Sequence, residues 1–311
     1  MRDLATRGLV ERIAGSGTYV RRVASSNAMT FGLLIPELGT TEIFEPICRG
    51  IAASPQAREH ALLWGHEQSP SELCGQFVER RVAGVFFAPI ESGPEALQTN
   101  IAIVERFEAA RIPVILLDRC VLPYPRRSRH DLVGIDNRRA GFLATEHLLR
   151  LDARHISLIA HRTFASTVEA RITGFREALL SHGREQEIHA IHRLDVITHE
   201  TVSSLLKEND AFVCANDRTA GQLMRVLTDL GANIPRDFRM VGIDDVEYAS
   251  LLPVPLTTVH QPCRQIGEAA MGAMLERVAR PDMFVRDILV ECHLVVRESC
   301  GAHSIGRQQP A

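Results

Sequence analysis

The sequence predicts an α/β protein built from two doubly wound parallel-sheet subdomains, and two observations support this prediction. Short apolar runs such as GVFFAPI, IPVILLD and HISLIAH recur from residue 31 onward, and longer segments with helical periodicity separate most of them. After Asp136 the same alternation begins a second time, starting with a helix. Strands that helices cover on both faces are apolar along most of their length, so this pattern is typical of buried parallel sheets.

Each half of the pattern contains four or five expected strands. They are FGLLIPEL, HALLWG, GVFFAPI, IPVILLD and LVGID in the first half, and HISLIAH, EIHAIHRL, AFVCAN and FRMVGIDD in the second. The helix after HISLIAH is amphipathic, because Val168, Ile172, Phe175 and Leu179 recur on one face. Trp64 lies within HALLWG, where we expect it to pack in the core.

Composition indicates a soluble globular protein of the cytoplasm. The 311 residues are 45% hydrophobic and 23% charged, with a net charge of −3, so contact with nucleic acid would need a local basic patch. The seven cysteines are odd in number and lack CxxC spacing, which favours free thiols in a reducing compartment. The segment MRDLATRGLVER has no apolar core typical of a signal peptide, and no apolar run is long enough to cross a bilayer.

Polar residues directly after the strands are the candidate ligand-binding groups, because ligands of open α/β sheets bind beyond the carboxyl ends of the strands. Four pairs occupy such positions, namely Asp118-Arg119, Asp136-Asn137, Asn216-Asp217 and Asp244-Asp245. Carboxylates, amides and guanidinium groups are suited to hydrogen-bonding sugar hydroxyls, which predicts one shared cleft. The alternative is that these residues cap the following helices, and Asn216-Asp217 fits that alternative well.

Signals of enzymatic chemistry are absent from the sequence. It lacks the GxSxG, HExxH, GxxxxGK[ST] and GxGxxG motifs, and its histidines have no metal-ligand spacing. We therefore expect a non-enzyme without a cofactor or a metal.

The segment GLVERIAGSGTYVRR, residues 8–22, predicts a β-hairpin with a glycine turn. It contains three of the four arginines that cluster at Arg7, Arg12, Arg21 and Arg22. The alternatives are a short solvated edge hairpin and a nucleic-acid-binding element.

Two family resemblances follow from these motifs. The segment MRDLATRGLVERIAGSGTYV resembles the end of the winged helix-turn-helix domain of GntR regulators, which implies that residues 1–22 are the end of a recognition helix and a wing, with a linker at 23–30. Residues 30–300 resemble the LacI/GalR-type effector domain, which has the type I periplasmic-binding-protein fold, through VGIDNRRAGFLATEHLLRL, AFVCANDRTAGQ and MVGIDDVEYASLLPVPLTTVHQP. Their combination resembles the arabinose-repressor type of regulator.

The resemblance implies subdomain boundaries and site residues. It places the N-terminal subdomain at about 31–136 plus 263–283, the C-terminal subdomain at about 137–262 plus 284–300, and a tail at 301–311. The implied ligand-binding residues are Ile43, Phe44, Glu91, Asp118, Arg119, Asp136, Arg171, Asn216, Asp244 and Gln261. The implied DNA-binding residues of the wing are Arg12, Ser16, Gly17, Thr18 and Tyr19. Two departures from the family pattern are Pro55, which interrupts the first helix, and the segment 121–131, which is a surface loop or a lid.

The resemblance implies a homodimeric bacterial repressor whose sugar effector closes the two subdomains about a hinge and alters operator binding. Because the start of the recognition helix is missing, we expect this chain to bind DNA weakly and in a salt-sensitive way at most. Three alternatives remain: a stand-alone sugar-binding protein, a truncated sensor without DNA-binding activity, and an enzyme on the same fold, such as a racemase or a nucleoside hydrolase.

Overall fold

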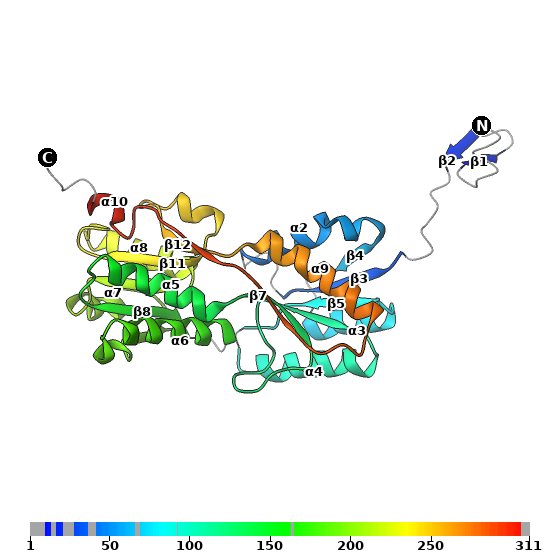
Figure 1. Cartoon of the computed structure of the whole chain (residues 1–311), viewed down its shortest axis with the longest axis horizontal. Coiled ribbons are helices and arrows are strands. Elements are labelled where there is room, and N and C mark those ends of the chain that lie inside the picture. Colours follow the sequence, from blue (N-terminus) through cyan, green and yellow to red (C-terminus); the bar gives the residue numbers. More distant parts are fainter. Residues whose placement is uncertain are drawn as a thin grey trace.

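Two α/β subdomains lie end to end along the long axis of the molecule (Figure 1). The computed structural model describes residues 10–13, 17–20, 28–36, 42–65, 69–91, 93–162 and 165–305. Among them, two six-stranded sheets form the centres of the subdomains, which confirms the predicted fold class. No helix in this part of the chain is both long and apolar enough to span a lipid bilayer.

The N-terminal sheet has the strand order β13-β7-β6-β5-β3-β4, and its neighbouring strands all run parallel. Its strands are β3 (Thr30–Leu34), β4 (Ala61–Trp64), β5 (Gly84–Phe87), β6 (Val114–Leu117), β7 (Asp131–Ile135) and β13 (Asp287–Val290). The helices of this subdomain are α2 (Phe44–Ala53), η1 (Pro55–Glu59), α3 (Pro70–Glu79), α4 (Ala96–Ala109) and α9 (Cys263–Ala279). As predicted, α2 ends just before Pro55, which begins a separate 3₁₀ turn.

The C-terminal sheet has the order β14-β12-β11-β10-β8-β9, and it is parallel except for the antiparallel pair β12-β14. Its strands are β8 (Ile156–His161), β9 (Ile191–Leu194), β10 (Ala211–Cys214), β11 (Arg239–Asp244), β12 (Thr257–His260) and β14 (His293–Val295). The helices are α5 (Asn137–Arg150), α6 (Ser166–Ser181), η2 (Glu185–Glu187), α7 (His199–Ser203), η3 (Leu205–Lys207), α8 (Asp217–Asp229), η4 (Glu247–Ser250) and α10 (Ala302–Ile305).

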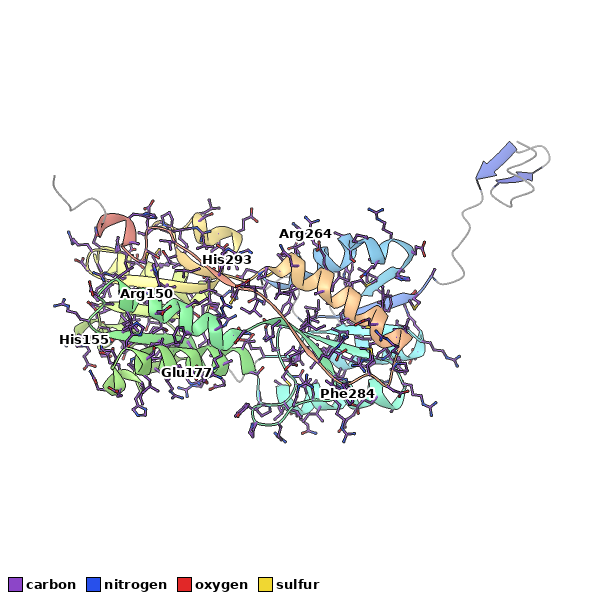
Figure 2. All side chains as sticks on the ribbon, viewed as in Figure 1. Arg150, His155, Glu177, Arg264, Phe284 and His293 are labelled. Carbon is purple, nitrogen blue, oxygen red and sulfur yellow. The ribbon has the colours of Figure 1, made fainter. Side chains whose placement is uncertain are left out.

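The chain passes between the two subdomains three times within the described residues: from β7 into α5, from β12 into α9, and from β13 to β14. The last crossing differs from the expected boundary near residue 284. Phe284 lies on the surface of the N-terminal subdomain (Figure 2), and the following strand β13 pairs with β7 from Asp287 to Val290. The backbone of β7 would otherwise be an unpaired sheet edge, so this segment extends the N-terminal sheet before the chain crosses over.

Two pairs of helices pack unusually closely beside these crossings. A Cβ atom on Gly141 of α5 would lie 2.0 Å from the carbonyl oxygen of Arg171 on α6, and one on Gly174 would lie 1.9 Å from that of Arg138. In the N-terminal subdomain, Gly267 of α9 approaches the carbonyl oxygen of Ile47 on α2 in the same way, at 2.1 Å. Each subdomain therefore contains one backbone-to-backbone helix contact that only glycine allows.

The predicted core position of Trp64 is wrong, because its side chain is 61% exposed. The residue ends β4, which is the edge strand of its sheet, and both end residues of this strand are exposed.

The N-terminal hairpin consists of β1 (Val10–Ile13) and β2 (Gly17–Val20), which pair antiparallel with Val10 opposite Val20. Arg12, Gly17, Thr18 and Tyr19 are therefore strand residues. Ser16, most of the expected linker and the end of the expected tail lie outside the described residues.

Candidate functional site

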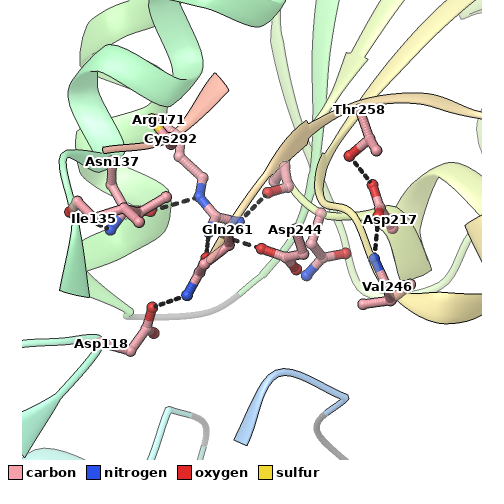
Figure 3. Close-up of polar contacts among 12 residues, drawn as sticks. Asp118, Ile135, Asn137, Arg171, Asp217, Asp244, Val246, Thr258, Gln261 and Cys292 are labelled. Atoms are coloured by element: carbon pink, nitrogen blue, oxygen red, sulfur yellow. Dashed lines mark hydrogen bonds and ion pairs between the residues drawn. The ribbon is translucent and has the colours of Figure 1, made fainter. Parts of the chain in front are cut away.

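The candidate site lies between the subdomains, where polar side chains follow strands of both sheets (Figure 3). Asp118 follows β6 in the N-terminal subdomain, and Asp244 ends β11 in the C-terminal subdomain. Gln261 lies in the crossing from β12 to α9, between these two carboxylates. Arg171 reaches the same place from α6 (Figure 3).

Arg171 is the centre of the hydrogen-bond network in this cleft. Its guanidinium group donates from Nε to Asn137 Oδ1 at 2.8 Å and from Nη1 to the carbonyl oxygen of Ala215 at 2.5 Å. Nη2 donates to Asp244 Oδ1 at 3.0 Å and to Gln261 Oε1 at 3.4 Å. A guanidinium group has five N–H donors, and these contacts occupy four of them. The buried arginine therefore fixes the side chains around it.

Gln261 joins the two subdomains through its amide group. Its Oε1 accepts from Arg171 in the C-terminal subdomain, and its Nε2 donates to Asp118 Oδ1 in the N-terminal subdomain at 3.1 Å. These partners determine the orientation of the amide, because Arg171 can only donate and the Asp118 carboxylate can only accept. With a residue exposure of 2%, Gln261 is a buried link across the hinge.

Arg119 occupies the N-terminal side of the cleft. Its Nε donates to Asp118 Oδ2 at 3.1 Å, and its Nη1 contacts a carboxylate oxygen of Glu91. The guanidinium carbon also lies 5.3 Å from the centroid of the Phe44 ring, within the range of a cation–π contact. The guanidinium group of this buried arginine is therefore in contact with two carboxylates, which neutralise its charge, and with one aromatic ring.

The backbone is strained at the strand ends that carry the acidic residues. Asp118 has a φ of 69°, Asp244 of 127° and Asp245 of 58°, in the left-handed region that favours glycine. Such conformations cost about 1–3 kcal/mol each and cluster at functional sites.

Burial raises the pKa values of two carboxyl groups in the C-terminal subdomain. Burial is the main cause of the rise in the pKa of Asp244 to about 8, and the charge of Arg171 opposes it, whereas the charges of Asp217 and Asp118 add to it. Asp217 accepts hydrogen bonds from Thr258 Oγ1 at 2.6 Å and from the Val246 amide at 3.0 Å, and burial raises its pKa to about 6. Asp244 is therefore mostly protonated at neutral pH and can both donate and accept a hydrogen bond.

The raised pKa of Asp244 predicts a pH dependence of stability. The unfolded chain ionises this group near pH 4, so the native state binds the additional proton between about pH 4 and pH 8. Its contribution to the free energy of unfolding should therefore fall as the pH rises through this range, by up to about 1.4 kcal/mol per pH unit. Urea unfolding at pH 5, 6, 7 and 8 gives the free energy of unfolding of wild type and of Asp244→Asn. The difference between the two free energies, plotted against pH, measures this slope.

Asp237→Asn is the matched control for this experiment. Hydrogen bonds from Arg236 and from the Asn233 amide lower the pKa of exposed Asp237 to about 2. Its carboxylate is charged at every pH tested, so its difference from wild type should stay constant. If the free-energy difference from wild type had the same pH dependence in both variants, the raised pKa could not be assigned to Asp244.

Two cavities flank the hydrogen-bond network. One of about 470 Å³ is lined by Ile43, Asp244 and Gln261 together with Glu42 and Tyr248. The other, of about 420 Å³, is lined by residues of both subdomains that include Glu91, Arg119, Ser166 and Glu169. These spaces are large enough for a small organic ligand, and both adjoin the polar groups described above.

Further contacts tie the subdomains together at the edges of the cleft. Glu42 Oε1, in the N-terminal subdomain, lies 2.9 Å from Arg218 Nη2 and accepts a hydrogen bond from Tyr248 Oη at 3.4 Å. On the other side, the backbone amide of Cys120 donates to Ser166 Oγ at 3.2 Å.

Comparison with known proteins places this architecture in a family. Residues 145–300 match the family model described as periplasmic binding protein-like domain. An uncharacterised HTH-type transcriptional regulator from the aml 5′ region of Streptomyces limosus is 30% identical over 298 residues, which cover 89% of this chain and 80% of that protein. This chain belongs to the periplasmic-binding-protein-like family.

Further proteins similar to this member of the periplasmic-binding-protein-like family are also named regulators. The arabinose metabolism transcriptional repressor of Geobacillus stearothermophilus is 26% identical over 317 residues, covering 96% of this chain and 84% of the repressor. The crystal structure of a LacI family transcriptional regulator from Enterococcus faecium, with bound ribose, has a TM-score of 0.73 and 25% identity. The structural match covers 87% of this chain and 98% of the Enterococcus faecium protein.

The structure brings most of the expected ligand-binding residues of this family member together. Those in or directly beside the cleft are Ile43, Phe44, Glu91, Asp118, Arg119, Arg171, Asp244 and Gln261. Asp136 and Asn216 have the alternative role as helix caps. Asp136 accepts from the amide of Arg139 at 2.9 Å and is exposed, whereas Asn216 accepts from the amide of Thr219 at 2.8 Å.

One residue of the network, Asn137, was missing from the expected ligand-binding set. It begins α5, and its Oδ1 accepts from Arg171. Its position in the post-strand pair Asp136-Asn137 was the available signal. Asp136 of this pair caps the helix, whereas Asn137 contacts the cleft arginine.

Proposed function

We propose that this protein is a bacterial transcriptional regulator, acting as a repressor, that binds a small sugar-like effector between its subdomains. The observation that carries the proposal is the continuous network from Asp118 through Gln261 and Arg171 to Asp244, at the carboxyl ends of strands from both sheets. The relatives named above are transcriptional regulators, and the similar structure from Enterococcus faecium contains ribose.

The chemistry of the cleft suits a ligand with many hydroxyl groups. Asp118 and Glu91 offer carboxylate acceptors, and the amide of Gln261 offers both kinds of group. Arg119 and Phe44 place a cation and an aromatic ring on the N-terminal side. A sugar ring has hydroxyls that donate and accept, together with apolar C–H faces that pack on such a surface.

Effector binding would act through the hinge. A ligand that forms hydrogen bonds with Asp118 and Gln261 competes with the bond that joins them. The equilibrium between open and closed arrangements then changes by the difference in affinity of the effector for the two forms. Because Gln261 lies in a crossing segment, a change in its partners alters the relative orientation of the subdomains.

For the DNA-binding side, we propose that the hairpin β1-β2 is the wing of a GntR-type winged helix-turn-helix. Its antiparallel register from Val10–Val20 to Ile13–Gly17 supports this reading, as does the similarity to the arabinose metabolism repressor over 96% of this chain. We propose a cytoplasmic homodimer, in which effector-dependent rotation of the subdomains changes the spacing of two DNA-binding heads.

A ligand screen by thermal unfolding tests the proposed effector site. At least one pentose or hexose should raise the unfolding midpoint of the wild type, and the sugar should be recovered unchanged. At a concentration of 100 times the dissociation constant, the expected stabilisation is about 2.7 kcal/mol. Gln261→Ala should abolish this stabilisation, because it removes the amide group that we propose both donates to and accepts from the effector.

Glu177→Gln is the control variant for the screen. Glu177 lies on α6 (Figure 2) and pairs with exposed Arg138 at 2.6 Å rather than with cleft residues. It should respond to the sugar as the wild type does. The absence of a shift with every sugar tested would refute the proposed effector class.

A further inference from the structure

The charged groups that line the cleft are mostly acidic. Among the described residues, six ionised carboxylates and three arginines line the two cavities, beside the mostly protonated Asp244. The carboxylates are those of Glu42, Glu45, Glu91, Glu169, Asp245 and Glu247. The arginines are Arg49, Arg119 and Arg264. Three of these carboxylates pair with arginines outside the cavity lining, Glu42 with Arg218, Glu169 with Arg193 and Asp245 with Arg297. An anionic ligand would therefore need a lining cation that is not already paired with a carboxylate.

Each of these arginines already has a carboxylate partner. Arg49 pairs with Glu45 at 2.5 Å, and Arg264 pairs with Glu268 at 3.2 Å. Arg119 pairs with Asp118 and Glu91, as described above. Arg171, buried behind the cavities, pairs with Asp244.

One histidine also lines the larger cavity, and it too is next to a carboxylate. This residue is His260, whose Nδ1 lies 2.8 Å from a carboxylate oxygen of Asp245.

We propose that the effector is an uncharged, hydroxyl-rich molecule, and that the cleft discriminates against sugar phosphates and sugar acids. This inference rests on the proposed function and narrows its ligand class. The physical reason is hydrogen-bond complementarity. Carboxylates only accept, so they need the donors that hydroxyl groups supply, whereas the oxygens of an ionised phosphate or carboxylate are themselves acceptors.

The inner cluster also explains why a cationic ligand is disfavoured. Asp118 and Glu91 both pair with Arg119, and Asp118 is linked through Gln261 to Arg171, so this cluster contains two carboxylates and two guanidinium groups. Burial raises the pKa of Asp244 to about 8, so this third acid is mostly uncharged at neutral pH. The inner cluster is therefore close to neutral, and an ammonium group would find no unpaired carboxylate to offset its loss of hydration.

Matched ligand sets test the proposal at pH 7. Ribose is compared with ribose 5-phosphate and ribonic acid, and glucose with glucose 6-phosphate, gluconic acid and glucosamine. Equivalent sets are made for arabinose and xylose, and each ligand is titrated calorimetrically into the full chain. For the sugar that binds, we expect its phosphate and its acid to bind at least 100-fold more weakly.

Two outcomes separate this proposal from the proposed function. If a phosphate, acid or amino sugar binds as tightly as its neutral parent, the assignment of an uncharged effector is overturned, although a sugar effector stands. If no member of any set binds, the sugar-effector function fails and this inference fails with it.

A variant tests whether the carboxylates cause the discrimination. Glu91→Gln leaves Arg119 with Asp118 as its remaining carboxylate partner and so increases the positive potential of the smaller cavity. We expect the ratio of neutral to phosphate affinity to fall about tenfold in this variant and to stay at the wild-type value in Glu177→Gln. An unchanged ratio in Glu91→Gln would contradict the charge argument.

Discussion

Replacing Arg171 with methionine is expected to destabilise the protein by about 3–5 kcal/mol and to abolish effector binding. The substitution removes four hydrogen bonds and leaves Asp244, Asn137 and Gln261 without their buried partner. Leaving a buried polar group without its hydrogen-bond partner costs about 1–3 kcal/mol, so the groups that lose Arg171 together account for a loss of this size. Urea unfolding measures the stability, and the sugar titration measures binding.

Arg138→Met is the matched control for this substitution. Arg138 lies on α5, has a side chain that is 62% exposed and pairs with Glu177. An exposed ion pair contributes less than about 1 kcal/mol. A loss for Arg171→Met that is no larger than the loss for Arg138→Met would show that the cleft network does not hold the subdomain together.

The second large effect is expected for Gly141→Ala, which adds one methyl group where α5 meets α6. The new Cβ would lie 2.0 Å from the carbonyl oxygen of Arg171, so the two helix backbones must separate. Overpacking of this kind costs about 1–3 kcal/mol, and a contact with backbone belongs at the upper end. Because the displaced turn carries Arg171, effector binding should weaken together with stability.

Gly221→Ala provides a control with the opposite sign. Gly221 lies inside α8, and the nearest atom to a new Cβ there is Leu252 Cδ2, at 3.5 Å. Alanine is favoured over glycine in a helix by up to about 1 kcal/mol, so this variant should be slightly more stable than wild type. Destabilisation of Gly221→Ala equal to that of Gly141→Ala would refute the explanation by close helix packing.

The alternation of strands and helices was predictable because buried strands such as β5, β6 and β10 are continuously apolar. Strands β12, β13 and β14 were not among the expected ones. Their residues are TTVH, DILV and HLV, in which polar or exposed positions break the apolar run. These strands form through pairing with partners distant in the sequence, which local patterns do not reveal.

The candidate site was predictable to the level of strand ends, but not of individual roles. Four polar pairs after strands pointed to one edge of the fold, and the structure places Asp118 and Asp244 there. Whether such a residue faces the cleft or caps a helix depends on the local backbone. Asp136 has the extended conformation of an N-cap, whereas Asp244 has a φ of 127°. Sequence patterns do not encode this difference, because aspartate is common in both settings.

The three crossing segments have a mechanical consequence. A single connecting strand would let the subdomains swivel freely, whereas three separate strips of chain, at β7–α5, β12–α9 and β13–β14, resist twisting. The closely packed helix pairs α5–α6 and α2–α9, which meet at Gly141 and Gly267, adjoin these crossing segments. We therefore expect deformation to concentrate in the crossing segments. Ligands of different shape would then change the angle between the subdomains by different amounts. Substitutions in the β13–β14 strip, whose residues line neither cavity, would change this response without altering the surface that contacts the ligand.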